Sequence, residues 1–394
     1  IKAMHNRLRR ITGQPIEVLD FDDDRLTHVL RHLSKQEVWP AIEQERSEQC
    51  IPVYALPTEV VRCDTTTVSG YHPVEEGGVM QFGHSQGDPT LPQLKRSTAT
   101  LDLGGLGMPV ATAVVSGETA DDGLYVEMVT RTVETLKKTG LLFVGDCKMS
   151  SVRNRQAIAA KGQYYLAPLA LTGETAQSLP RWIDAGIEKQ EAGALIQVVR
   201  ENERGEIELK AQGYEFERIL PRATAGAGGG EVTERVIIVH SPAYAQRQAN
   251  VLEKNLDHAH QAIAALTPPP GRGKRQITQE SEGQAAIAQI EKQDHVEGFL
   301  EVTYAGHTRI ETRYVGRGRG SAERERREIT HVRYHITSVV RKESAIAAAQ
   351  QRMGWKAYVT NAPTTRLVLE EAVLCYRNQY RMRIATNGSK ATST

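Results

Sequence analysis

The sequence lacks the residue patterns that build disulfide scaffolds, zinc knuckles and membrane spans. Its 394 residues contain four cysteines, Cys50, Cys63, Cys147 and Cys375, and no two of them form a Cys-x-x-Cys pair. A zinc or disulfide framework is therefore not indicated, and we expect reduced thiols. Apolar stretches such as 236–239 have the length of a strand, far below the roughly 20 residues that a membrane helix needs. We therefore expect a cytoplasmic protein without membrane contact.

The sequence also lacks an excess of charge and a nucleotide-binding motif. Its 49 Lys and Arg nearly balance 48 Asp and Glu, so the net charge of +1 does not point to a polyanionic partner. It has neither a Gly-Lys-Ser/Thr loop nor a Gly-x-Gly-x-x-Gly motif between a strand and a helix, which argues against ATP and NAD. The most basic segment, 316–328, interleaves arginines with glutamates, a pattern that favours a solvated ribbon tip over a phosphate-binding surface.

The length of the chain is enough for two or three domains. The predicted parts are an N-terminal helical segment at 1–57, the first part of an α/β core at 58–170, an insertion at 171–350, and the last strand and helix of the core at 351–394. The predicted fold class is α/β, with a mixed sheet and flanking helices. A mainly β insertion, with a helical hairpin at 243–293, interrupts this core.

Hydrophobic periodicity gives the expected positions of the individual elements. In the first core block we expect strands at 59–68, 97–103, 109–115, 141–147 and 164–169, and helices at 121–138 and 151–160. In the insertion we expect strands at 193–199, 235–240 and 329–340, and a ribbon formed by 298–304 with 308–315. The chain then closes with a strand at 355–360 and a helix from 365 to about 381.

Two aspartates stand out because they lie in otherwise apolar strands. Asp64 lies within the predicted strand at 59–68, and Asp146 lies near the end of the strand at 141–147. A carboxylate in such a place is costly unless it is paired, hydrogen-bonded or bound to a cation. If the two strands are neighbours, both side chains converge on one edge and share a divalent cation through their oxygens. The simpler interpretation, in which each aspartate caps a turn or a helix, stays open.

Short motifs follow one another in a characteristic order along residues 20–380. They are CDTTTVSGYH at Cys63–His72, Gly83-His84-Ser85 with LPQLK at Leu91–Lys95, VGDCKM at Val144–Met149, VTNA at Val359–Ala362 and YRNQY at Tyr376–Tyr380. With these motifs, and with a long insertion before the last helix, the chain resembles the DDE transposases of bacterial insertion sequences.

The resemblance implies an RNase H-like catalytic core that binds Mg²⁺ or Mn²⁺. Such a core cuts double-stranded DNA at the terminal inverted repeats of a transposon and joins the ends to target DNA. By this likeness Asp64 and Asp146 are the first two catalytic acids and metal ligands. The likeness also implies self-association on DNA. We expect Lys148, His84, Tyr376, Arg377 and Lys390 on DNA, while a plain surface lysine at 148 and a structural histidine at 84 stay open.

The third acid of the family is missing from its expected place. The family's Tyr-x2-Arg-x3-Glu-x6-Lys signature, counted from Tyr376, puts the glutamate at a position where this chain has Arg383, and Lys390 falls at the final lysine. Glu370 and Glu371 lie about 18–20 Å away along a helix, too far to substitute. Arg383 would repel a metal ion, because its guanidinium stays charged. We therefore expect an impaired enzyme, with a C-terminus truncated or changed by a frameshift, within what was a longer transposase.

Two other functions stay open. The chain is alternatively a non-catalytic remnant of a transposase that binds DNA or self-associates. A phosphatase of the haloacid dehalogenase type, with Asp64 as its nucleophile, carries little weight. That chemistry needs a second aspartate two residues further on, where this chain has Thr66.

Overall fold

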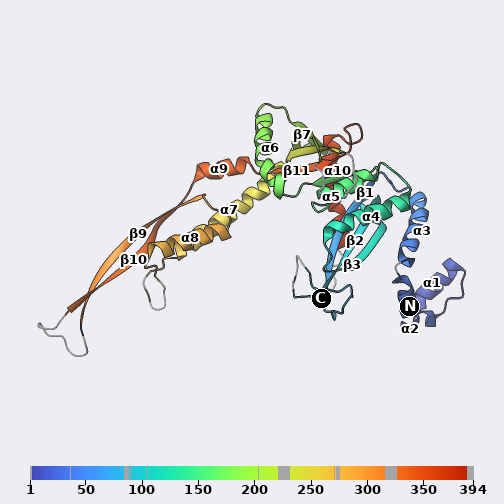
Figure 1. Ribbon diagram of the computed structural model, residues 1–394, viewed down its shortest axis with the longest axis horizontal. Coiled ribbons are helices and arrows are strands. Elements are labelled where there is room, and N and C mark those ends of the chain that lie inside the picture. Colours follow the sequence, from blue (N-terminus) through green and yellow to red (C-terminus); the bar gives the residue numbers. More distant parts are fainter. Residues whose placement is uncertain are drawn as a thin grey trace. The chain divides into compact units, whose positions relative to one another are not determined.

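The computed structural model describes residues 2–387, except for 36, 84–87, 89, 104, 203, 221–230, 270, 272–275 and 316–325 (Figure 1). For residues 2–5, 18, 121–122 and 379–387 it describes the backbone. The chain divides into two compact units. Unit 1 comprises 1–180, 214–238 and 357–394, and unit 2 comprises 181–213 and 239–356. This division does not test the domain boundaries predicted at 57, 170 and 350, which remain a prediction.

Helices open the chain, as the polar helical pattern predicts. They are α1 (Lys2–Thr12), a short 3₁₀ helix (Val18–Phe21), α2 (Asp23–Leu33) and α3 (Val38–Val53). Asp22 caps α2, because its Oδ1 accepts a hydrogen bond of 2.8 Å from the backbone N–H of Arg25. The run of three aspartates at 22–24 therefore marks the start of this helix.

A nine-stranded sheet dominates the described part of the chain, in the order β3-β2-β1-β4-β5-β11-β8-β7-β6. Its strands are β1 (Val60–Ser69), β2 (Gln93–Leu103), β3 (Leu106–Ser116), β4 (Leu142–Val144), β5 (Tyr164–Pro168), β6 (Ile196–Glu201), β7 (Ile207–Ile219), β8 (Thr233–His240) and β11 (Trp355–Thr360). Strand β4 runs parallel to β1 and to β5, whereas the pairs β1–β2, β2–β3 and β5–β11 are antiparallel. The α/β fold class is confirmed, and this mixed sheet is consistent with an RNase H-like core.

Helices α4 (Asp121–Leu136), α5 (Val152–Ala160), α6 (Gly173–Glu191) and α10 (Leu369–Asn387) accompany these strands. Alternation along β2 explains one packed face, because Ser97, Ala99 and Leu101 are buried while Thr98 and Thr100 are only partly covered. The strands β4 and β5 are buried on both faces, and their sequences are therefore almost continuously apolar, as is typical of parallel strands.

Side chains from helices close the free edge of the sheet at β3. Glu43 on α3 accepts a hydrogen bond of 2.9 Å from the backbone N–H of Thr112. It also forms an ion pair of 2.8 Å with Arg131 on α4. Arg131 also donates to the carbonyl of Thr112 over 2.7 Å, and Arg46 donates to the carbonyl of Pro109 over 2.8 Å. Backbone groups that an edge strand would otherwise expose are thereby paired, and α3 is held against β3.

Unit 2 has a hydrophobic core of its own, formed by α7 (Pro242–Ala265), α8 (Glu280–Gln293), α9 (Glu343–Gln351), β9 (Leu300–Tyr314) and β10 (Arg326–Arg341). The buried cluster includes Leu252, Leu256 and Ile263 of α7, Leu300 of β9 and Ile346 of α9. The helical hairpin predicted at 243–293 is confirmed by α7 and α8. The insertion also contains α6, β7 and α9, which periodicity did not predict.

The ribbon in unit 2 pairs differently from the expectation. Instead of a turn between 304 and 308, β9 continues without a break and pairs with β10 over their whole lengths. Gly306, in the segment between the two expected strands, lies opposite Tyr334, and an added Cβ would come within 3.2 Å of the tyrosine ring. The glycine therefore makes room for an aromatic ring rather than for a turn.

Two other expectations need adjustment. Strand β4 ends at Val144 rather than at 147, so Asp146 lies just beyond the strand. Helix α10 continues to Asn387, past the end expected near 381, although its last residues lack the leucines of a packed helix. Among the described residues, no helix is both long enough and apolar enough to cross a membrane.

Candidate functional site

The two predicted acids follow corresponding positions of the neighbouring parallel strands β1 and β4. In the β1–β4 ladder, Arg62 pairs with Val144. Asp64 and Asp146 each follow two residues later, Asp64 in the middle of β1 and Asp146 just beyond the end of β4. Asp64 also pairs with Thr98 across β1 and β2. Both aspartates are half-buried. The order of the strands therefore brings together two acids that are 82 positions apart in the sequence.

Tyr125, on the second turn of α4, contacts the second acid directly. Its hydroxyl donates a hydrogen bond of 2.6 Å to Oδ1 of Asp146. Burial raises the pKa of Tyr125 far above its ordinary value, and the charges of Asp146 and Asp64 raise it further. The hydroxyl therefore remains a proton donor at any physiological pH. Both carboxylates therefore lie close enough to Tyr125 for their charges to act on its phenol.

Cys63 lies next to the first acid and is fully buried. Burial, followed by the neighbouring charge of Asp64, raises the pKa of its thiol from 9.0 to about 12. A thiol of this kind stays protonated and is a poor nucleophile. The cysteine of the Cys63-Asp64 motif is therefore a packing residue, and it gives the first acid an apolar neighbour.

The loop that carries Asp146 is held by hydrogen bonds on both sides. Gly145 donates its N–H to the carbonyl of Leu166 over 3.2 Å, and an added Cβ on Gly145 would lie 2.7 Å from the Met149 sulfur. The backbone N–H of Lys148 donates to Oδ1 of Asp146 over 2.9 Å. The glycine of the Val-Gly-Asp-Cys-Lys motif thus lets the chain turn tightly, and the turn itself orients the carboxylate.

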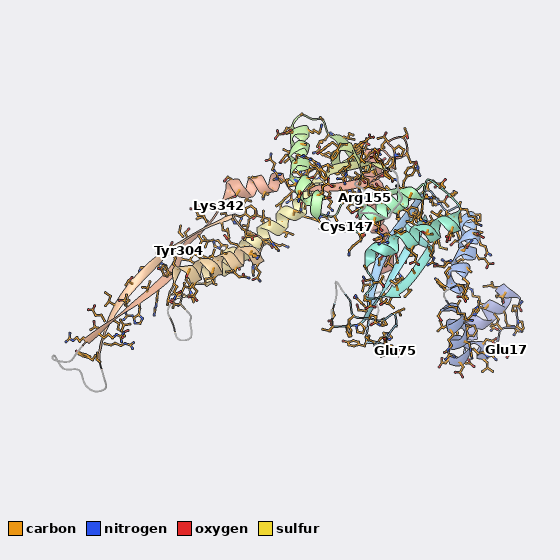
Figure 2. The ribbon with its side chains drawn as sticks, in the orientation of Figure 1. Glu17, Glu75, Cys147, Arg155, Tyr304 and Lys342 are labelled. Atoms are coloured by element: carbon orange, nitrogen blue, oxygen red, sulfur yellow. The ribbon has the colours of Figure 1, made fainter. Side chains whose placement is uncertain are left out.

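Arg155 on α5 fastens the end of this loop to the interior of unit 1. Its Nε donates to the carbonyl of Ser150 over 2.8 Å, and its guanidinium forms an ion pair with Glu234 of β8 (Figure 2). Glu234 also accepts hydrogen bonds of 2.8 Å from the hydroxyl of Tyr165 and from Nε of Arg218. Glu234 is fully buried, so three donors around one carboxylate satisfy the requirement for a buried charge.

The last helix covers the face of the sheet that carries Asp64. Arg62, two residues before Asp64 and therefore on the same face of β1, donates from Nη1 to the carbonyl of Cys375 over 2.9 Å. Further along α10, the ring of Tyr376 packs against that of Tyr358 on β11, with 4.9 Å between centroids. Arg383 belongs to the same helix, and only its backbone is described.

The residues expected on DNA occupy different environments. Lys148 is exposed, and Tyr376 and Arg377 are half-buried on α10. His84 and Lys390 lie outside the described residues. The structure thus brings Lys148 beside Asp146 and places Tyr376 in an aromatic pair, and it leaves the role of these side chains on DNA as a prediction.

The described donor set suits a hard cation only in part. Asp64 and Asp146 offer the carboxylate oxygens that Mg²⁺ prefers. In the described ranges, however, no group of three or more His, Cys, Asp or Glu residues is arranged to hold a metal ion. A cation at this place would therefore take two protein carboxylates and complete its shell with water or substrate oxygens.

Tyr125 is the site residue that sequence reasoning missed. It lies in the stripe Leu124, Tyr125, Met128 and Val129, all buried, and the spacing of this stripe is that of an ordinary helix facing a core. Nothing in the pattern separates its hydroxyl from the surrounding apolar positions. A tyrosine with a buried hydroxyl needs a hydrogen-bond partner, and this requirement was the available signal.

Comparisons with known proteins give a distant structural similarity. No protein-family model matches the chain, and no curated protein matches it. Among solved structures, the chain is similar to the piggyBac transposase of a synaptic complex with hairpin DNA, determined by cryo-EM. The two chains are 9% identical with a TM-score of 0.28, over 74% of this chain and 52% of the other. The chain thus spans about half the length of that protein, and a similarity of this degree assigns no activity.

Proposed function

We propose that the chain is a DNA transposase of an insertion sequence, with Asp64 and Asp146 as its catalytic acids. The observation that carries the proposal is their equivalent register: each acid lies two residues beyond the paired residues Arg62 and Val144 of the neighbouring parallel strands β1 and β4. The order of the motifs in the sequence supports the same assignment. Its substrates would be the terminal inverted repeats of the element and a target duplex.

The two carboxylates would hold Mg²⁺ or Mn²⁺. When bound, such a cation stabilises the charge that develops on phosphate oxygens during in-line displacement. The chain's own residues orient the acids. Tyr125 and the backbone N–H of Lys148 both donate to Oδ1 of Asp146 and leave its other oxygen, Oδ2, for further interactions. Tyr125 itself is fully buried, so this hydrogen bond to Asp146 comes from the core.

We further propose that this copy is impaired. The position where the resemblance requires a glutamate on the last helix holds Arg383, whose charge is permanent. Only two of the family's three catalytic acids are then present to bind the metal ion. A non-catalytic remnant that binds transposon ends or self-associates is the second candidate, and the absence of an acid at position 383 favours it.

Cleavage of a duplex that carries the two ends of the element tests the proposal. We expect slow, Mg²⁺- or Mn²⁺-dependent nicking at the ends, abolished by Asp64→Asn and by Asp146→Asn. Cleavage that survives both substitutions would overturn the assignment of the acids. Binding to the ends without cleavage in either metal would support the remnant instead.

Restoring the missing acid by Arg383→Glu separates the two interpretations of the C-terminus. We expect little gain, because the residues after Met382 lack the leucines and aromatics of a packed helix. A large gain in cleavage would mean that the helix end is already in its working position and that only the acid is missing.

A further inference from the structure

The two faces of the β9–β10 ribbon carry different charges. In an antiparallel pair, residues directly opposite share a face, and successive pairs alternate between faces. Beginning with the pair of Ala305 and His335, one face carries His307, Arg309, Glu311, Arg313, Arg327, Ile329, His331 and Arg333. This surface is called the basic face below. Its described residues include four arginines and three histidines, against a single glutamate.

The opposite face of the ribbon is neutral and packs on α8 at its base. Its described residues between 306 and 334 include one arginine, Arg326, and one glutamate, Glu328. The hydroxyl of Tyr304, on the same side, donates to Glu280 over 2.8 Å and accepts from Gln284 over 2.7 Å (Figure 2). Because this face meets α8, the basic face points away from the helix. Figure 1 shows that the ribbon extends past the end of α8.

The pairing within the basic face brings like charges together. Arg313 lies directly opposite Arg327, and Arg309 and Arg333 each lie opposite a histidine. Opposite charges on cross-strand neighbours stabilise a sheet, whereas like charges destabilise it. The acid of this face, Glu311, forms hydrogen bonds of 2.9 and 3.3 Å with Arg313 and lies 3.4 Å from Nε2 of His331. The ribbon therefore retains an excess of positive charge on an exposed surface, which an external polyanion would neutralise.

We propose that the basic face of the ribbon binds the phosphate backbone of duplex DNA. The choice of DNA among polyanions rests on the proposed function. From Ala305 to Arg313 the strand covers about 27 Å at roughly 3.4 Å per residue, and this length corresponds to about eight base pairs. Guanidinium groups present a planar fork of donors that matches phosphate oxygens. A two-stranded ribbon is also narrow enough to lie along a groove of B-form DNA.

The composition of the face favours DNA over a lipid surface. Membrane-binding surfaces combine basic residues with apolar side chains that enter the acyl region. On the basic face, Ile329 is the one large aliphatic residue among those described, and it is half-buried. The apolar residues of the ribbon, such as Ile310 and Val332, lie on the other face. The basic face therefore carries positive charge but few apolar side chains that could insert into a membrane.

The structure also changes the interpretation of the interleaved charges near 316–328. Most of this segment lies outside the described residues, but Arg326, Arg327 and Glu328 are described. Alternation places Arg327 on the basic face, and places Arg326 and Glu328 on the opposite face. Charges that alternate in the sequence are thus separated in space, because the side-chain period of a strand is two.

Adjacent arginines on opposite faces provide a matched pair of variants. Arg327→Gln removes a charge from the basic face. Arg326→Gln removes one from the other face, where the guanidinium lies 5.3 Å from the centre of the Tyr314 ring. Binding of the full chain to a fluorescent 30-base-pair duplex is measured by anisotropy in EDTA at several KCl concentrations. A variant with Arg309→Gln, Arg313→Gln, Arg327→Gln and Arg333→Gln together removes the arginines of the face.

We expect the fourfold variant to reduce the salt dependence, the slope of log K against log[KCl], by about 3–4, at roughly 0.9 for each phosphate that is no longer neutralised. Arg327→Gln should reduce the slope by about 1, and Arg326→Gln should leave it unchanged. Circular dichroism confirms folding, and the two single variants keep the test valid if the fourfold variant misfolds. An unchanged slope in the fourfold variant, equal effects of the two single variants, or tighter binding to anionic vesicles or single-stranded RNA than to duplex DNA would overturn the proposal.

Failure of this proposal is distinguishable from failure of the proposed transposase activity. Binding is measured in EDTA, so it does not depend on cleavage. Cleavage that persists with normal end selection while the fourfold variant binds as well as the wild type counts against the ribbon alone. Duplex binding through the ribbon, without any cleavage that depends on Asp64, counts against the catalytic assignment alone.

Discussion

The hydroxyl of Tyr125 donates a hydrogen bond of 2.6 Å to Oδ1 of Asp146. This contact joins α4 to the loop that follows β4, and it links a buried core residue to one of the two predicted acids. The phenol is fully buried and keeps its proton, because burial and the nearby carboxylates raise its pKa. Asp146 is therefore oriented from the interior of unit 1, and the first prediction follows from this contact.

Replacing Tyr125 with phenylalanine should weaken metal binding at the two acids. Residues that orient a metal ligand contribute about 10–100-fold to metal affinity or activity. Removal of the hydrogen bond to a carboxylate should also cost about 1.5–3 kcal/mol in the free energy of unfolding. Isothermal titration calorimetry with Mn²⁺ measures the affinity, and urea denaturation measures the stability.

Tyr165→Phe is the matched control for this experiment. It removes a hydroxyl that donates to Glu234 over 2.8 Å rather than to Asp146. We expect a similar loss of stability with little change in Mn²⁺ affinity. If both variants bind Mn²⁺ as tightly as the wild type, Tyr125 does not position a metal ligand.

Breaking the ion pair between Arg155 and Glu234 should destabilise unit 1 strongly. Arg155→Met leaves a fully buried carboxylate with fewer donors, and removal of one partner of a buried pair costs about 3–5 kcal/mol. Urea denaturation of the variant checks the prediction. Lys137→Met, which breaks the exposed pair with Glu48, should change the midpoint by no more than the error of the measurement. A midpoint for Arg155→Met that matches the wild type would contradict the structural role of the pair.

Because the thiol of Cys63 is buried, the free energy of unfolding should fall at alkaline pH. Its pKa is raised from 9.0 to about 12 in the folded protein, so the unfolded chain loses the proton first. The stability due to the neutral thiol is complete below pH 9 and is lost as pH rises toward 12. Unfolding free energies measured at pH 8 and pH 10.5 should fall more for the wild type than for Cys63→Ala, a difference that removes the contribution of the tyrosines. Equal falls in the two proteins would place the thiol in contact with solvent.

Thiol labelling gives an independent test of the same burial. Cys147 is exposed, whereas Cys63 is fully buried. In native protein at pH 8 we expect an aromatic disulfide reagent to modify Cys147 readily and Cys63 only at the rate of unfolding. Mass spectrometry of the labelled peptides separates the two sites. Rapid labelling of Cys63 would contradict its burial in the core.

Removal of Glu43 should release α3 from the edge of the sheet. Its carboxylate is buried and binds both the N–H of Thr112 and the guanidinium of Arg131. Glu43→Ala should cost about 3–5 kcal/mol, because it leaves the guanidinium of Arg131 without its carboxylate partner. Hydrogen exchange of the peptide that covers 106–116 should also accelerate. The control Glu45→Ala, at an exposed position of the same helix, should leave both quantities unchanged.

Local sequence patterns predicted much of the first core block and little of the site around the acids. Strands β1, β3 and β5 and helix α5 were predicted to within a few residues, because alternation and apolar spacing act over short distances. Strand β7 was missed, although Glu208 and Lys210 alternate with apolar residues in the period of two that marks a strand. The turn expected near Gly306 was wrong, because the space over this glycine belongs to a ring from the opposite strand.

By itself, the sequence determined the α/β class, the two aspartates in apolar strands and the presence of Arg383 where an acid was expected. The tertiary structure decided which residues meet. The register of β1 and β4 aligned Asp64 with Asp146, the packing of α4 supplied Tyr125, and the pairing of β9 with β10 gathered arginines on one face. These relationships depend on contacts between residues far apart in the chain, and a local pattern of side chains carries no information about its distant partner.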